Sequence, residues 1–106
     1  MIGTVDVVIA GDGAVARAAA VGALERGQRV LVVLRSGEAR VARRLRRLLL
    51  RTAGTGGGQL SVMTATEVVC VDGVNGVEAV LVRRVATGHL SAVNASAFLS
   101  CDGENN

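Results

Sequence analysis

The segment that most constrains the fold of this chain is a glycine-rich turn, the sequence GDGAVA at residues 11–16, which joins an apolar run to an alanine-rich run. Gly11 permits a tight turn, because glycine has no Cβ to clash in unusual backbone conformations. Gly13 leaves the backbone open to close approach, and the small Ala16 lets a helix pack closely on a strand. The pattern predicts a strand, a turn and a helix whose first N–H groups can bind an anion such as pyrophosphate.

The first half of the chain alternates between apolar runs and helical patterns. Continuous apolar runs predict strands, buried on both faces, at residues 5–10 and 29–34, and a third short strand is expected at residues 60–63. A helix is expected at residues 14–26, because Gly27 supplies a glycine stop signal. A second helix is expected at residues 37–52. Ser36 is the candidate cap of this second helix, and its predicted apolar stripe consists of Val41, Leu45, Leu48 and Leu49.

The second half changes to a strand pattern after a glycine-rich loop at residues 52–58, which could be a turn or a flexible segment. Strands are expected at residues 66–71, 77–85 and 90–94, and the Asp-Gly and Asn-Gly pairs between the first two predict a hairpin. A last apolar strand is expected at residues 97–101. The predicted fold is therefore α/β, a Rossmann-like parallel sheet (βαβαβ plus a final strand) with a three-stranded antiparallel meander inserted.

Length and composition favour one domain with an aliphatic core. The chain has 106 residues, half of them apolar, and Phe98 is its only aromatic residue. A domain of this size can bury a core without disulfide or metal staples. We expect a single dinucleotide-binding domain over residues 1–103, followed by a frayed C-terminal tail at residues 104–106.

Positive charge is concentrated in one segment. All twelve cations are arginines, and residues 35–51 hold seven of them against the single acid Glu38, whereas the rest of the chain is net negative. Such a segment can meet phosphates, an anionic membrane or an acidic partner. The near absence of aromatic rings disfavours nucleic-acid binding, because there is almost nothing to stack on bases. Arg43, Arg44, Arg46, Arg47 and Arg51 are expected on the exposed face of the second helix.

The cysteines and the N-terminus favour a soluble, metal-free protein. Cys70 and Cys101 lie in apolar strand-like runs and form no CxxC pair, so we expect two buried thiols in a reducing compartment. His89 is the only histidine, which leaves a Cys/His zinc site without enough ligands. No basic region typical of a signal peptide precedes the first apolar run, and charged residues interrupt the longest apolar stretch. We therefore expect a cytoplasmic location and no membrane association.

The end of the second predicted strand indicates which dinucleotide would bind. An acidic residue there would bind a ribose hydroxyl of NAD or FAD. This chain has Leu34-Arg35-Ser36 instead, and Arg40 lies one helical turn beyond. Guanidinium groups make bidentate contacts with phosphate, which suits the 2′-phosphate of NADP(H). NADP(H) is therefore the favoured ligand and FAD a weaker alternative, although these arginines could also be ordinary solvated side chains.

These motifs resemble the pyridine-nucleotide-binding domain of the thioredoxin reductase-like flavoprotein disulfide oxidoreductases. The resemblance extends over nearly the whole chain: the GxGxxA turn, two of the three arginines of a basic motif (Arg35 and Arg40), a meander and a closing strand that ends near Gly103. Leu34 and Ser36 replace the family's His and second Arg, and its redox CxxC and its flavin domain are absent. The resemblance implies cofactor contacts at Gly11, Gly13, Ala14, Val15, Ala16, Arg35, Ser36, Arg40 and Gly103.

Several functions stay open at this point. In the first, the chain is a dinucleotide-binding domain or small subunit that binds NADP(H) for electron transfer to a separate flavin domain or partner, with no catalytic centre of its own. In the second, it is a degenerate Rossmann-like domain kept for assembly, with its arginine-rich helix facing an acidic partner, or a homo-oligomer. An FAD-binding fragment, and a nucleic-acid or membrane patch at residues 35–51, are the weaker readings.

Overall fold

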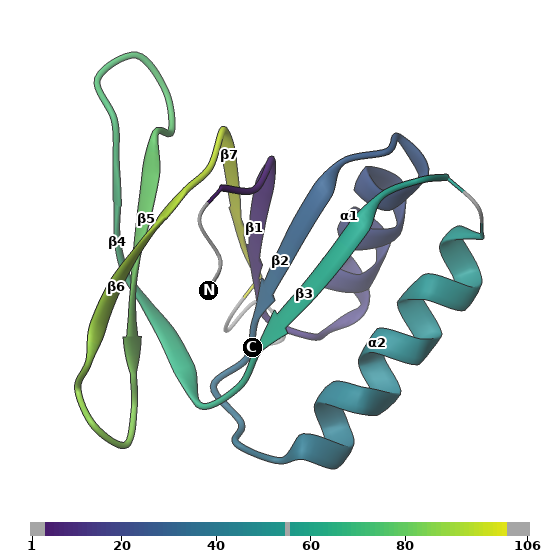
Figure 1. The fold of residues 1–106 in the computed structure, drawn as a ribbon, viewed down its shortest axis with the longest axis horizontal. Helices are drawn as coiled ribbons and strands as arrows, with labels where there is room; N and C mark the ends of the chain where they lie inside the picture. The colour runs from purple at the N-terminus through teal and green to yellow at the C-terminus, as the bar shows by residue number, and fades with distance from the viewer. Residues whose placement is uncertain (1–3, 55, 102–106) are drawn as a thin grey trace.

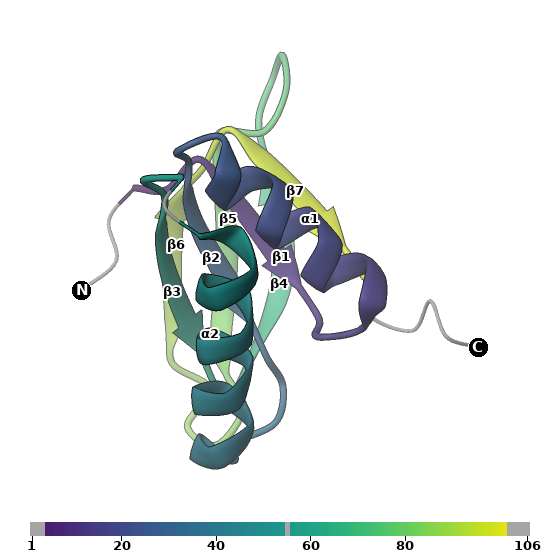
Figure 2. The same ribbon diagram turned by 90° about the vertical axis from the view of Figure 1, so that its right-hand side faces the viewer.

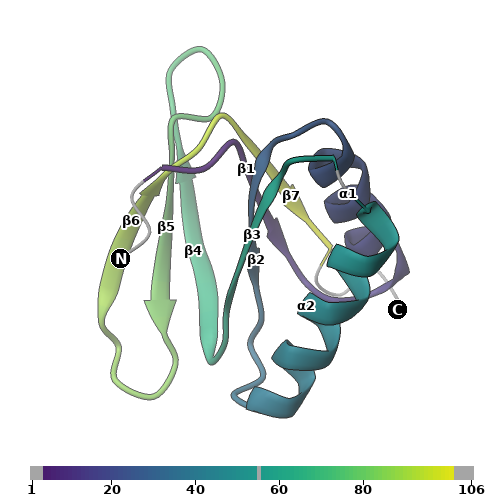
Figure 3. The same cartoon turned by 45° about the vertical axis from the view of Figure 1, so that its right-hand side comes forward.

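The computed structural model describes residues 4–54 and 56–101, which form three layers (Figures 1 and 3). Two helices form one outer layer, a parallel sheet the middle layer, and an antiparallel sheet the other outer layer. The elements in chain order are β1 (Val7–Ala10), α1 (Ala14–Glu25), β2 (Arg29–Val33), α2 (Ala39–Ala53), β3 (Gln59–Met63), β4 (Thr66–Asp72), β5 (Ala79–Arg84), β6 (Leu90–Asn94) and β7 (Ala97–Ser100).

The middle layer is a four-stranded parallel sheet in the order β3-β2-β1-β7. In its register Ala10 lies beside Val33 and also beside Ser100, so the carboxyl ends of the three strands meet at one edge. Both helices cover the same face of this sheet (Figure 2). The antiparallel meander β4-β5-β6 covers the other face. The predicted α/β Rossmann-like fold with its meander insert is confirmed.

Alternation along the strands divides the core into two halves, because successive side chains point to opposite faces of a sheet. Ile9 of β1 belongs to the helix-side cluster, with Leu24 and Leu49. Val8 of the same strand belongs to the meander-side cluster, with Val80 and Val93. Both faces of the parallel sheet are covered, which is why its central strands consist almost wholly of apolar residues.

The meander exposes one thiol that the sequence suggested would be buried. The β4–β5 register shifts between Val68 and Cys70, which marks a bulge in β4. A bulge changes which side chains face the core. Cys70 is consequently exposed, whereas Cys101 is buried. The expectation of two buried thiols is wrong for Cys70.

The second helix also departs from its predicted pattern. It begins at Ala39, with Glu38 in the N-cap position and no side-chain cap, so Ser36 does not cap it. The Ser36 hydroxyl instead accepts a hydrogen bond from the Glu38 N–H at 3.2 Å, before the first helical turn. Leu45 and Leu49 are buried as predicted, but Leu48 is 42% exposed, because it faces the groove between the two helices rather than the sheet.

The glycines after α2 have a packing role. A Cβ on Gly56 would lie 2.7 Å from the Leu24 carbonyl oxygen, and a Cβ on Gly58 would lie 2.7 Å from that of Gln28. Real Cβ atoms do not approach so closely, so this loop can cross the end of α1 only where side chains are missing. The segment predicted as a turn or flexible loop is therefore held against α1, and α2 itself extends to Ala53.

Neither described helix is long and apolar enough to cross a membrane. Among residues 4–54 and 56–101 no group of three or more His, Cys, Asp or Glu side chains is arranged to hold a metal ion.

Candidate functional site

The glycine turn joins β1 to α1 at the carboxyl edge of the parallel sheet. Gly11 has φ +120°, a value that favours glycine, and its N–H donates to the Val33 carbonyl at 3.1 Å. Gly13 occupies the N-cap position of α1 with φ −73°. Its lack of a side chain therefore provides space rather than conformational freedom. Ala16 is 2% exposed and lies in the core beside Ile9, as expected for a small residue at a close helix–strand contact.

The first turn of α1 presents unbonded backbone donors. The first helical bond of the segment runs from the Arg17 N–H to the Gly13 carbonyl at 2.9 Å. The N–H groups of Ala14, Val15 and Ala16 precede it and have no acceptor in the described structure. No side chain caps this end and no acidic residue lies in its first turn. Together with the helix dipole, these amides form an anion-binding geometry.

The end of β2 lies directly beside this turn. Leu34 is 3% exposed and is held by two hydrogen bonds: its N–H donates to the Met63 carbonyl at 2.8 Å, and its carbonyl accepts from the Thr66 N–H at 3.0 Å. The next two residues, Arg35 and Ser36, are exposed. The structure therefore brings these two predicted site residues to the same sheet edge as the glycine turn.

Arg35 has a partner that sequence reasoning missed. Its guanidinium lies 3.6 Å from a carboxylate oxygen of Glu67 on β4, and the same carboxylate binds Arg83 of β5. Hydrogen bonding to Arg83, reinforced by the charges of Arg83 and Arg35, lowers the pKa of Glu67 below its usual 4.5. No local motif marks Glu67, since it meets Arg35 only because the short connection at residues 64–65 leads the chain from β3 into the second sheet.

The other arginines of the basic segment separate into two groups. Arg46 is exposed as expected, and its guanidinium also donates to the Leu60 carbonyl at 2.5 Å, which joins α2 to β3. The remainder are exposed and make no ion pair within the described structure: Arg40, Arg43, Arg44, Arg47 and Arg51. Arg40 lies in the first turn of α2, two residues after its N-cap and five residues after Arg35. Gly103, the last predicted site residue, lies outside the described residues.

The chain matches no protein-family model and no curated protein. Its fold matches solved structures of thioredoxin reductases and of a variant of the FAD-dependent halogenases. Thioredoxin reductase from Streptococcus pyogenes MGAS5005 superposes with a TM-score of 0.72 at 20% identity over 96% of this chain and 32% of that one. Thioredoxin reductase from Giardia duodenalis gives 0.70 at 19% identity, covering 96% and 32%. The myxobacterial chondrochloren halogenase, a variant of the FAD-dependent halogenases, gives 0.70 at 16% identity, covering 98% and 38%.

The predicted resemblance to thioredoxin reductases is thus confirmed at the level of the fold. At 16–20% identity this similarity shows the fold alone. The chain spans about a third of the length of these proteins.

Proposed function

We propose that this chain is a dinucleotide-binding domain whose preferred ligand is NADP(H). The observation that carries the proposal is the β1–α1 turn: Gly11 at φ +120° and three first-turn amides without acceptors lie beside a β2 end that bears arginine and no acid. A pyrophosphate would lie on the amides of Ala14, Val15 and Ala16, and the helix dipole would favour its charge.

Arg35, Ser36 and Arg40 would hold the 2′-phosphate. They follow the end of β2, where an acidic residue would otherwise bind a ribose diol, and the exposed Arg35 and Arg40 can both reach into solvent. Arg35 already meets one anionic group, the Glu67 carboxylate, at 3.6 Å. A phosphate carries more negative charge than this carboxylate and can accept from both arginines, so it would draw Arg35 away from Glu67.

The chain itself would bind and orient the nucleotide, and a partner would complete the reaction. When bound, the nicotinamide supplies hydride chemistry, which needs an acceptor such as a flavin. The three structural neighbours named above are enzymes about three times as long as this chain, and one is described as FAD-dependent. These proportions support a flavin-binding domain or subunit as the electron-transfer partner.

The experiment is a titration of the purified chain with NADPH, NADH and FAD, followed by calorimetry and thermal unfolding. The chain has no Trp or Tyr, so nucleotide fluorescence can be read beside it with little interference. The proposal expects NADPH to bind most tightly and to raise the unfolding temperature, as a ligand specific for the native state must. Equal binding of all three, or no binding at near-millimolar NADPH, would refute it.

A second candidate function, an assembly subunit, is favoured by one observation. The six arginines of α2 are all exposed and have no ion-paired acid within the described structure, and like charges three or four residues apart destabilise a helix by about 0.2–0.5 kcal/mol per pair. An acidic partner would relieve that repulsion. Arg47→Glu separates the two functions, because it should weaken assembly with a candidate flavoprotein yet leave NADPH affinity unchanged.

A further inference from the structure

The inner face of the meander changes from apolar to cationic along its length. Val80 of β5 pairs with Val93 of β6, and both are buried. The next inward pair along the hairpin is Val82 with Ser91. Beyond it, the Arg84 N–H donates to the His89 carbonyl at 2.9 Å, which sets these two residues opposite one another at the base of the β5–β6 turn. Arg84 and His89 are both exposed, so they lie at the end of this face that is open to solvent, beyond its buried valines.

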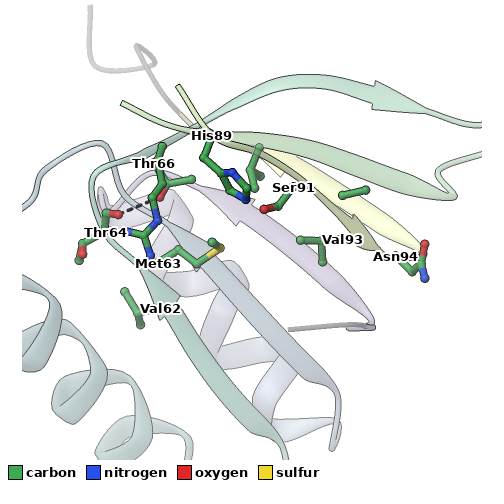
Figure 4. A pocket seen from close by; sticks show the side chains of 11 residues that line it. Val62, Met63, Thr64, Thr66, His89, Ser91, Val93 and Asn94 are labelled. Atoms are coloured by element: carbon green, nitrogen blue, oxygen red, sulfur yellow. Dashed lines mark hydrogen bonds between the residues drawn. The ribbon is translucent and has the colours of Figure 1, made fainter. Parts of the chain in front are cut away.

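This cationic end opens into a cavity of about 860 Å³ between the two sheets. One wall is the end of β3, including Val62 and Met63, and the other is formed by β5 and β6. Figure 4 shows the His89 and Ser91 side chains directed into the space, with Asn94 at the far end from His89. The volume lies within the range of small-molecule sites, about 300–1,000 Å³.

The cavity is suited to an anion with an apolar body. Its lining includes Arg84 and His89 but no Asp or Glu. Neither side chain makes a hydrogen bond or ion pair within the described residues, whereas the neighbouring Arg83 on the outer face is bound to Glu67. The Thr66 hydroxyl is already used, because it donates to the Thr64 carbonyl at 2.8 Å. The Arg84 guanidinium and the His89 imidazole, neither of which has a partner among the described residues, thus line one end of a partly apolar space.

We propose that this inter-sheet cavity binds a small monocarboxylate with an apolar body. The guanidinium of Arg84 would hold the carboxylate, with His89 and Ser91 as further hydrogen-bond donors, and Met63, Val82 and Val93 would contact the apolar body. The single negative charge of a carboxylate is balanced by one guanidinium, whereas a phosphate dianion would keep an unbalanced charge. The apolar lining disfavours a fully hydrated ion.

The cavity is separate from the proposed nucleotide site. Its lining contains no residue of the glycine turn and none of Leu34, Arg35, Ser36 or Arg40. It lies on the meander side of the parallel sheet, whereas α1 packs on the opposite face and its first-turn amides lie at the carboxyl edge of the sheet. The proposal therefore goes beyond nucleotide binding and does not depend on it.

The test uses decanoate as the probe and decanol as its uncharged match, each titrated into the ¹⁵N-labelled chain. Decanoate is expected to shift the amides of residues 62–66 and 84–94 and to bind at least about tenfold more tightly than decanol, as a charge-assisted hydrogen bond implies. Arg84→Gln should lower decanoate affinity by about tenfold, and His89→Gln by less. Arg83→Gln is the matched control, because it removes the same charge from the outer face of the same strand.

Three results would overturn the proposal. One is no decanoate binding at millimolar concentration, and another is equal binding of decanoate and decanol. The third is competition between decanoate and NADPH, which would make the cavity part of the nucleotide site. Arg84 is exposed, so Arg84→Gln should keep the dispersed amide spectrum of a folded chain. Should it not, His89→Gln decides the outcome, because unchanged decanoate affinity in that variant also refutes the assignment.

Discussion

The two strand-to-helix junctions of the parallel sheet lie side by side, yet the first is defined by its backbone and the second by its side chains. At the β1–α1 junction a positive-φ glycine and unbonded amides create the geometry, with no charged side chain required. At the β2–α2 junction no residue has a positive φ, and the charges of the junction come from the side chains of Arg35, Glu67 and Arg40. A backbone-defined site can be recognised from local sequence, whereas a side-chain-defined site depends on partners brought together by the fold.

Replacing a glycine with alanine should change the free energy of unfolding very differently at the two junctions. Gly11→Ala should destabilise the chain by about 1–3 kcal/mol, because alanine is strained at φ +120°. Gly37→Ala should be neutral or slightly stabilising, since its Cβ would lie an ordinary 3.5 Å from that of Ala65 and its φ is not positive. Denaturant unfolding of both variants measures the difference. Equal changes in the free energy of unfolding for the two variants would contradict the distinction between the junctions.

Removing Arg35 and Arg40 tests the β2–α2 junction, where the proposed site depends on side chains. Arg35→Ala combined with Arg40→Ala should weaken NADPH binding by about tenfold or more, because two charge-assisted contacts to the 2′-phosphate are lost. Binding of NADH should change little, because it lacks that phosphate. Arg47→Ala is the matched control, an exposed arginine of the same helix without an ion pair. A parallel loss of NADPH and NADH affinity would argue for a general electrostatic role instead.

Neutralising Glu67 should act in the opposite direction and more weakly. Glu67→Gln releases Arg35 from its ion pair and removes a negative charge near the expected phosphate. NADPH affinity should rise by no more than severalfold, because ion pairs at the surface are weak. Calorimetric titration at low salt is the measurement. A decrease in affinity would mean that Glu67 orients Arg35 for binding rather than competing for it.

The smallest effect concerns acid stability. Hydrogen bonding to Arg29 lowers the pKa of Asp6, and hydrogen bonding to Arg83 lowers that of Glu67. A carboxyl group whose pKa is lowered on folding stabilises the native state above its ordinary pKa and loses that contribution as the pH falls through the folded value. Stability should therefore decline below about pH 4.5, the ordinary value for Glu67. Glu67→Gln should show a shallower decline, and an unchanged slope would contradict the assignment.

The fold was largely predictable because its signals are local. The apolar run at residues 29–34 predicts a strand covered on both faces, and Leu31, Val32 and Val33 are indeed buried. The Asp-Gly and Asn-Gly pairs predict the β4–β5 hairpin, where Gly76 has φ +129°. Where several local signals agree, pattern and structure coincide.

The parts that could not be predicted arise from tertiary register. The bulge in β4 turns Cys70 outward, and no sequence period announces it. Arg46 is exposed like its neighbours, but its guanidinium donates to the Leu60 carbonyl. Glu67 meets Arg35 only because the fold places the start of β4 near the end of β2. Gly56 and Gly58 look like a flexible linker until the end of α1 is placed against them. Each of these features depends on a second segment whose position the sequence does not reveal.

A dinucleotide site built from both junctions can be tested by the amide chemical shifts of the ¹⁵N-labelled chain titrated with NADPH. We expect the largest changes at Ala14, Val15 and Ala16, whose N–H groups would acquire the pyrophosphate as an acceptor, with a second group at Arg35 and Ser36. Changes confined to one junction would remove the other from the site. No change in either at near-millimolar NADPH would contradict the claim altogether.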